Sequence, residues 1–337
     1  MTDPLAMTPP RLQIGLIGAG SMGALHARVI TQSLDADLAC VVDPSENAGD
    51  LIAERFRTQY APDLDGFEGL DAVIIASPTA THVEWALRAL RSGTPALVEK
   101  PLSEDASAAR ILVDEARNRE VPLMCGFLER YNPALLTALE IIDEPIHLTA
   151  VRHSPYVPRI ATGVAHDLLI HDVDVVLRMT GRLPDRLTAN LAYCHPKSDQ
   201  GAEDIAEVTL QYEGEMLASL SASRVSQHKV RTLMVAEIER LVEVDLVRQD
   251  VTVYRHVGNA PLDDDGPGYR QQTIIDIPTI HQPREALASQ LERFVAVVRG
   301  ELDAGTELAS LLGPHLVIAD VALAAAERSS SKQRLDE

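Results

Sequence analysis

The chain has 337 residues, of which 46 % are hydrophobic and 24 % charged, a composition typical of a folded globular protein and long enough to favour two domains. Its formal net charge of −20 argues against nucleic-acid binding, which needs clustered Lys and Arg, but permits a local basic pocket for an anionic substrate. Its three cysteines lack CxxC spacing, which favours a reducing compartment and predicts no metal site.

The N-terminal residues do not have the pattern of a signal peptide. No apolar run approaches the roughly 20 residues needed to cross a bilayer. We therefore expect a soluble, cytoplasmic protein with no membrane partner.

Strands and helices alternate up to about residue 128. Strands are predicted at 12–17, 38–42, 71–76, 96–98 and 122–127, and helices at 21–33, 45–56, 81–91 and 105–119. This alternation predicts βαβ units and a doubly wound parallel sheet with both faces covered.

The pattern changes after residue 132. Helices at 132–142 and 164–179 flank a strand at 147–153. Six strand-like segments then follow without helices, at 187–194, 206–212, 216–223, 231–236, 241–246 and 251–256. A loop at 263–269 and helices at 283–299 and 308–328 complete the chain. We expect an α/β protein with domains at 1–128 and 129–337, the second an α+β domain with a largely antiparallel open sheet. The last helix, 308–328, is a candidate to pack back on the first domain.

A glycine motif lies between the first strand and the first helix. Gly18 permits a tight turn, Gly20 lets a pyrophosphate approach the backbone, and Gly23 lets helix and strand pack closely. Asp43 follows the second strand, where a carboxylate binds ribose hydroxyls and repels a 2′-phosphate, which favours NAD over NADP. The residues Ser21 and Met22 complete the predicted phosphate loop. A glycine turn in an unrelated protein is the alternative.

A second set of residues predicted to line the cofactor follows the strand at 71–76. It consists of Ser77, Pro78, Thr79 and His82. Ligands of doubly wound sheets bind at the carboxyl ends of strands, so this loop is expected beside the nicotinamide. His82 starts a helix and is better interpreted as a capping or packing residue than as a catalyst.

The sequence Glu99-Lys100-Pro101 follows the next strand. Proline biases the preceding Lys100 towards an extended conformation, which helps to direct its side chain. An ammonium group there can hydrogen-bond a substrate hydroxyl and stabilise a developing alkoxide. The alternative is an ordinary surface lysine paired with Glu99.

Asp167 and His171 are four residues apart on the predicted helix at 164–179, and Asp174 continues the same face. The intervening residues are mostly apolar, so the helix is expected to be largely buried, where polar groups need a partner or a function. A histidine can take a proton from an alcohol, and a carboxylate can orient the imidazole. A structural Asp–His pair is the alternative.

In the order in which they occur, these motifs resemble the Gfo/Idh/MocA oxidoreductases over nearly the whole chain. The resemblance implies a Rossmann domain that binds NAD and a second domain whose open sheet often makes oligomer contacts, here a dimer or tetramer. It implies oxidation of a sugar or cyclitol hydroxyl, or the reverse reduction. By position, it assigns Lys100, Asp167 and His171 to catalysis. We also expect Glu99 and Lys100 to contact the cofactor.

Two further segments, 127–133 and 221–226, resemble family members that act on UDP-amino sugars, notably UDP-N-acetylglucosamine 3-dehydrogenases. We accordingly predict a UDP-N-acetylhexosamine substrate. Guanidinium groups bind diphosphates and carboxylates bidentately, and internal salt bridges are the alternative for each arginine. The predicted substrate-binding residues are Arg130, Tyr131, Asn132, Arg152, Arg159 and Arg224.

Other functions stay open at this point. An inositol or free-sugar dehydrogenase needs the same catalytic residues but no diphosphate pocket. An NAD-dependent glycosidase would oxidise its sugar only transiently, without net production of NADH. A non-catalytic NAD-binding regulator would need the glycine loop but not Lys100, Asp167 and His171.

Overall fold

The computed structural model describes residues 9–158, 160–199, 201–214, 216–261, 269–280 and 284–333. These residues form two compact units, separated in sequence between Leu128 and Glu129. The segment Glu285–His315, which the sequence analysis placed in the second domain, belongs to the first unit. Residues 129–284 and those from Leu316 onwards belong to the second.

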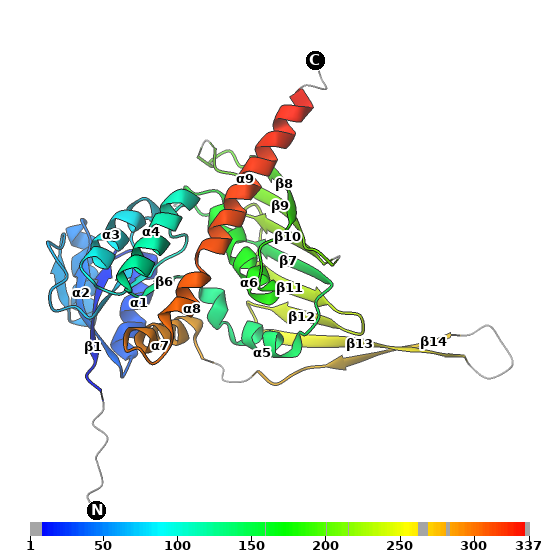
Figure 1. The fold of residues 1–337 in the computed structure, drawn as a ribbon, viewed down its shortest axis with the longest axis horizontal. Helices are drawn as coiled ribbons and strands as arrows, with labels where there is room; N and C mark the ends of the chain where they lie inside the picture. The colour runs from blue at the N-terminus through cyan, green and yellow to red at the C-terminus, as the bar shows by residue number, and fades with distance from the viewer. Residues whose placement is uncertain are drawn as a thin grey trace, which may run out of the picture. The chain divides into compact units, whose positions relative to one another are not determined.

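The first unit contains a six-stranded parallel sheet in the order β3-β2-β1-β4-β5-β6, which confirms the predicted doubly wound sheet. Figure 1 labels β1 and β6 of this sheet among the helices of the unit. Its strands are β1 (Leu12–Ile17), β2 (Ala36–Val42), β3 (Gln59–Ala61), β4 (Ala72–Ile75), β5 (Ala96–Val98) and β6 (Leu123–Cys125). The order reverses between β1 and β4, and crevices at such reversals are where these sheets bind ligands. Strand β3 has only three residues, too few to show a periodic pattern in the sequence.

Apart from the short helix at 304–309, the helices of the first unit begin and end largely where the sequence predicts. They are α1 (Ser21–Gln32), α2 (Glu46–Phe56), α3 (Thr79–Arg91), α4 (Ala106–Arg119), α7 (Ala286–Val298) and α8 (Ala304–Ala309). The Ser45 hydroxyl caps α2 by accepting from the Ala48 N–H, and Asp105 caps α4. All four residues of β4 are fully buried, as expected for a central strand covered on both faces.

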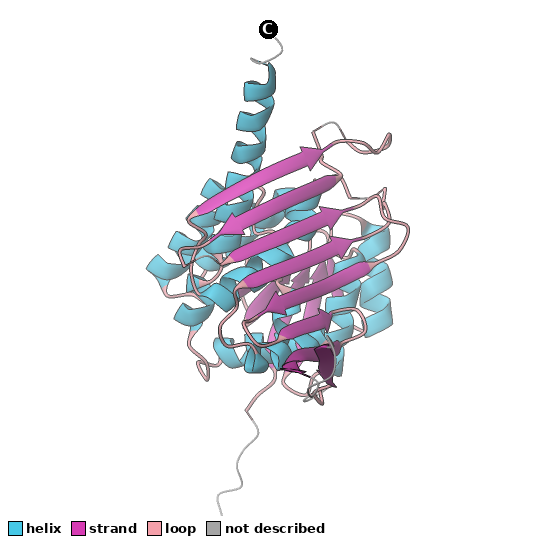
Figure 2. Cartoon of the chain, turned by 90° about the vertical axis from the view of Figure 1, so that its right-hand side faces the viewer, coloured by secondary structure: helices cyan, strands magenta, loops and turns pink. Residues whose placement is uncertain are grey.

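The second unit contains an eight-stranded sheet in the order β14-β13-β12-β11-β7-β10-β9-β8 (Figure 2). Only β7 and β10 pair in parallel, so the prediction of a largely antiparallel sheet is confirmed. The strands are β7 (His147–His153), β8 (Arg186–Ala192), β9 (Ile205–Gln211), β10 (Leu217–Ser223), β11 (Val230–Ala236), β12 (Leu241–Asp245), β13 (Asp250–Pro261) and β14 (Tyr269–Asp276). The loop predicted at 263–269 lies almost entirely outside the described residues.

Helical segments cover one face of this sheet, and Figure 2 shows the other face open within the unit. They are the 3₁₀ turn η1 (Leu128–Tyr131), α5 (Pro133–Ile141), the π-helical turn η2 (Ala165–Leu169) and α6 (Ile170–Thr180). Strand β10 shows the consequence for burial, because Ala218, Leu220 and Ala222 are buried whereas the alternate Leu217 and Ser219 are not.

The predicted helix at 308–328 is interrupted. Helix α8 ends at Ala309, and α9 (Leu312–Gln333) begins after a turn. By length and composition, the stretch Ala304–Glu327 is apolar enough to cross a membrane, with a mean hydropathy of 1.7 in its most apolar window. A core helix of a soluble protein passes the same test, and the break at residues 310–311 interrupts the stretch, so this is weak support for a span.

Candidate functional site

The glycine motif forms the turn between β1 and α1. Gly18 has a φ of +104°, and a Cβ there would lie 2.5 Å from the Ser77 nitrogen. A Cβ on Gly23 would lie 1.9 Å from the Gly18 oxygen. A Cβ on Gly20, by contrast, would meet nothing within 4 Å, so this backbone is open to a ligand. Two glycines are therefore required by the fold, and the third leaves the helix N-terminus accessible to a phosphate.

Asp43 connects the end of β2 to this loop. One carboxylate oxygen accepts from the Ala19 N–H at 2.8 Å, and the other accepts from the Ser45 N–H at 2.8 Å. Each oxygen retains a second lone pair that can accept from a ribose hydroxyl. The acid thus shapes the glycine loop and is positioned for the predicted ribose contact. Together with the open backbone at Gly20, these residues fit the adenosine half of NAD.

His82 fixes the loop that follows β4. Its ring is 1 % exposed, with Nε2 2.9 Å from the Ser77 carbonyl oxygen and Nδ1 2.8 Å from that of Pro101. It therefore links the Ser77–Thr79 loop to the Lys100–Pro101 peptide, which is cis. His82 therefore occupies a packing position that links two loops, and its place in the cofactor site stays a prediction.

Glu99 has a partner that the sequence analysis missed. Its Oε1 lies 2.8 Å from Nε2 of His26, a buried residue of α1. Burial alone would raise the pKa of Glu99, but the His26 hydrogen bond and the charges of His26 and Lys100 outweigh it, so the pKa is lowered. Glu99 is therefore a largely buried anion that His26 anchors to the glycine-loop helix.

His315 is a second missed residue of the first unit. Its Nε2 accepts from the Leu102 N–H at 2.9 Å, which makes Nδ1 the donor to the Leu311 carbonyl at 2.8 Å. The imidazole lies 5.9 Å, centroid to centroid, from the Phe127 ring. It thus secures the chain just after Lys100 from a residue more than 200 positions away. Neither histidine belongs to a motif, so no sequence signal identified them.

Asp167 and His171 lie in the second unit, in η2 and in the first turn of α6. Both are half-buried, whereas Leu168, Leu169 and Ile170 between them are buried. The sequence analysis expected a regular α-helix here, but residues 165–169 form a π-helical turn, a feature often found at functional sites. Four residues come close to one full turn in either helix type, so the two polar side chains still face the same side.

Glu203 and Arg224 hold the start of this helix. The Glu203 carboxylate accepts from the Ala165 N–H at 2.7 Å. The Arg224 guanidinium donates to the carbonyls of Ile160, Thr162 and Glu203, the last at 3.1 Å. Arg224 is buried and bonded to the backbone, so the geometry favours a positioning role over the predicted contact with substrate.

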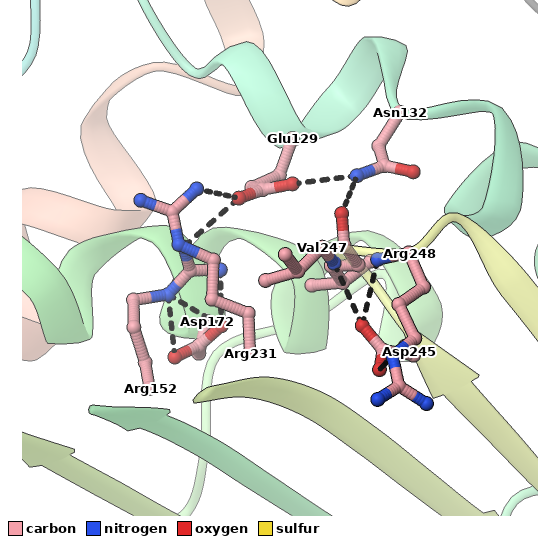
Figure 3. Close-up of polar contacts among 9 residues, drawn as sticks. Glu129, Asn132, Arg152, Asp172, Arg231, Asp245, Val247 and Arg248 are labelled. Carbon is pink, nitrogen blue, oxygen red and sulfur yellow. Dashed lines mark hydrogen bonds and ion pairs between the residues drawn. The ribbon is translucent and has the colours of Figure 1, made fainter. Parts of the chain in front are cut away.

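Arg152 lies at the centre of a buried ionic cluster (Figure 3). It is 0 % exposed, and it donates to both oxygens of Asp172 at 2.7–3.1 Å and to Glu129 at 2.9 Å. Burial disfavours its charge, but Asp172 and Glu129 outweigh that effect and raise the pKa of Arg152. With its guanidinium engaged by two carboxylates, Arg152 joins β7 to α6 and η1, and the geometry favours this structural role.

Three other predicted substrate residues, Arg130, Tyr131 and Asn132, are also buried. Arg130 is buried and binds Asp174 bidentately, with Nε 2.8 Å from Oδ2. Asn132 caps α5 through the Ala134 N–H and donates to Glu129 and to the Leu246 carbonyl. Tyr131 is buried. Arg159 lies outside the described residues.

Arg231 is a basic residue that the sequence analysis did not select. It lies on β11, and its Nη1 donates to Glu129 Oε1 at 3.2 Å. Its side chain is 29 % exposed, in contrast to the fully buried Arg152. An alternating strand gives no indication that one of its basic side chains points to the helix-covered face.

Comparison with known proteins agrees with this geometry. Residues 12–127 match the model of an oxidoreductase family with an NAD-binding Rossmann fold, and residues 145–239 match the GFO/IDH/MocA C-terminal domain. A UDP-N-acetylglucosamine 3-dehydrogenase from Acidithiobacillus ferrooxidans is 30 % identical over 85 % of this chain and 88 % of its own length. An inositol 2-dehydrogenase from Rhizobium meliloti is 26 % identical over 96 % and 98 %.

Solved structures show the same similarity. The Acidithiobacillus UDP-N-acetylglucosamine 3-dehydrogenase superposes with a TM-score of 0.80 at 27 % identity, covering 94 % of this chain and 97 % of that one. A structure described as a putative myo-inositol dehydrogenase from Sinorhizobium meliloti gives 0.77 at 25 % identity, over 94 % and 98 %. Both domain matches and a relative at 30 % identity over 85 % of the chain establish that it belongs to the Gfo/Idh/MocA family of NAD-binding oxidoreductases.

Proposed function

We propose that this protein is an NAD-dependent dehydrogenase that oxidises a ring hydroxyl of a sugar, with a UDP-N-acetylhexosamine as substrate. The observation that carries the proposal is the half-buried Asp167–His171 pair in a chain whose other unit has an open glycine loop with Asp43 beside it. The similarity to a UDP-N-acetylglucosamine 3-dehydrogenase over most of both chains supports the choice of substrate.

In the proposed reaction, the CH–OH group of the sugar loses a hydride from its carbon and a proton from its oxygen. The hydride goes to the cofactor, and the proton goes to the protein. NAD, when bound at the glycine loop, would supply the acceptor for the hydride that leaves the carbon. His171 takes the hydroxyl proton, so that a C=O group replaces CH–OH, and Asp167 orients the imidazole and stabilises its protonated form. Lys100 hydrogen-bonds the substrate oxygen and stabilises the negative charge that develops on it. Asp43 holds the ribose, and Ser21, Met22, Ser77, Pro78, Thr79 and Glu99 complete the proposed cofactor site.

The test is NADH formation by the purified protein with NAD and four substrates: UDP-N-acetylglucosamine, its uronic acid, UDP-glucose and myo-inositol. A carbonyl trap removes the keto product and draws an unfavourable equilibrium forward. Signal with a UDP-N-acetyl sugar is the expected result. Silence across the panel, in protein that binds NAD, would contradict the proposal.

An inositol dehydrogenase is the second candidate, favoured by 26 % identity to an inositol 2-dehydrogenase along 96 % of this chain. It would use the same acid–base residues but would need no diphosphate site. Inhibition by UDP separates the two, because UDP competes with a nucleotide sugar and not with an inositol.

We also propose that the protein is a cytoplasmic homo-oligomer, a dimer or tetramer formed through the open face of the eight-stranded sheet. That face is uncovered within its own unit (Figure 2). Light scattering coupled to size-exclusion chromatography tests the assembly, and a monomer at micromolar concentration would contradict it.

A further inference from the structure

Two arginines face each other on neighbouring strands of the second unit. In the antiparallel pairing of β7 and β11, Arg152 lies directly opposite Arg231. Like charges in this arrangement repel each other, and an acid between them is needed to offset the repulsion. Glu129 occupies that position, with a single oxygen accepting from Arg152 at 2.9 Å and from Arg231 at 3.2 Å (Figure 3).

The acids of this cluster are used mainly by Arg152. Asp172 receives three hydrogen bonds from Arg152, and Glu129 divides its charge between the two arginines. The guanidinium of Arg231 makes one hydrogen bond within the described part of the chain, and its buried Nε has no acceptor there. Burial and the neighbouring Arg152 lower the pKa of Arg231, so its charge is incompletely balanced.

Lys229 adds a second positive charge at the same place. It is the residue immediately before β11, two positions from Arg231. Because side chains two positions apart in an extended chain point to the same side, Lys229 lies on the same side as Arg231. It is exposed and makes no ion pair among the described residues. Repulsion from Arg231 and partial burial lower the pKa of Lys229. Lys229 and Arg231 thus form a local positive charge in a chain whose net charge is −20.

This basic spot lies within electrostatic reach of Asp167, one of the two proposed acid–base residues. The carboxylate of Asp167 is near enough to Arg231 to oppose the lowering of its pKa. Arg231 is held on one side by Glu129 and is 29 % exposed, so part of the guanidinium is accessible from solvent. An anion placed there would accept from the solvent-accessible part of the guanidinium, which makes one hydrogen bond within the described residues.

We propose that Arg231 and Lys229 form the subsite that binds the anionic diphosphate of the substrate. This inference rests on the proposed function and names the residues that distinguish a nucleotide sugar from a neutral polyol. Two cations match the charge of a diphosphate, and a guanidinium beside an ammonium offers both directed and adaptable donors. The buried Arg130, Arg152 and Arg224 then support this site without touching the ligand.

The experiment measures binding of UDP and of uridine to the full-length protein in the presence of NAD, by calorimetry. Arg231→Gln should weaken UDP binding about tenfold or more, because it removes a charge-assisted contact. Lys229→Gln should weaken it about two- to fivefold, since its side chain is exposed. Arg231→Lys should retain part of the affinity, and uridine binding should stay unchanged in all variants.

Arg255→Gln is the matched control, because this arginine of β13 pairs with Asp276 at an exposed position of the same sheet. Circular dichroism checks folding, and if Arg231→Gln does not fold, the exposed Lys229→Gln and the charge-conserving Arg231→Lys carry the test. Unchanged UDP affinity in the folded variants, or no UDP binding by the wild type, would overturn the inference.

The two proposals fail separately. If the wild type oxidises a UDP sugar while the folded variants keep its affinity for UDP, the subsite is wrong and the proposed function stands. If UDP binds in an Arg231-dependent manner while no sugar of the panel is oxidised, the subsite stands and the proposed dehydrogenase activity is wrong.

Discussion

Replacing Arg152 with methionine should destabilise the second unit more than any surface substitution. Arg152 is 0 % exposed and is the main counter-charge of two buried acids, Asp172 and Glu129. Methionine fills much of the same volume but leaves those carboxylates with a reduced counter-charge in a site of low polarity. Removing one partner of a buried ion pair costs about 3–5 kcal/mol, and we expect the unfolding free energy of this unit to fall by that amount.

The four hydrogen bonds of Arg152 cannot simply be summed. At about 1.5–3 kcal/mol for each charged hydrogen bond, the sum would exceed that range, but Asp172 can take up a proton and Arg231 remains beside Glu129. Both adjustments reduce the loss. A decrease of about 4 kcal/mol corresponds to nearly a thousandfold change in the ratio of folded to unfolded protein.

Urea denaturation followed by circular dichroism measures this loss, with Arg255→Gln as the control. The control removes an exposed pair and should change the unfolding free energy by about 1 kcal/mol or less. The double variant Arg152→Met with Asp172→Leu removes both main charges and should recover part of the loss. A loss for Arg152→Met no larger than that of the control would refute the reasoning that this cluster is a buried, mutually dependent set of charges.

Three further predictions concern the first unit and the proposed chemistry. His171→Asn should lower kcat by about two to four orders of magnitude while leaving NAD affinity unchanged, as measured by NADH formation and NAD titration, and unchanged turnover would exclude His171 as the base. Asp43→Asn should weaken NAD binding and bring the affinities for NAD and NADP closer together in parallel titrations. An unchanged ratio of the two affinities would show that Asp43 does not contact the ribose. Because the pKa of Glu99 is lowered in the folded state, its ionised form stabilises the protein above the ordinary value of 4.5, and this contribution is lost as the pH falls through the lowered value. The stability difference between wild type and Glu99→Gln should therefore be constant at neutral pH and shrink in acid, and a difference that grows in acid would contradict the role of His26.

The sequence by itself determined most of the architecture. Short apolar strands alternating with capped helices specify a parallel sheet because each strand must be buried on both faces, and consecutive strands without helices specify the antiparallel sheet. The glycine loop was also readable, since Gly18 and Gly23 occupy places where a Cβ would meet backbone atoms. These features depend on local sterics and periodicity, which neighbouring residues encode.

The tertiary structure decided which charged residues have charged partners. In the sequence, Arg152 and Arg231 are both basic residues of predicted strands, and only Arg152 is predicted to bind the substrate. The fold buries the first between Asp172 and Glu129 and leaves the second partly exposed. Likewise, His26 and Glu99 are 73 positions apart, and only the packing of α1 beside the end of β5 joins them. Pairing over such distances depends on which strands become neighbours and which side chains face the same layer, and no local pattern in the chain specifies that.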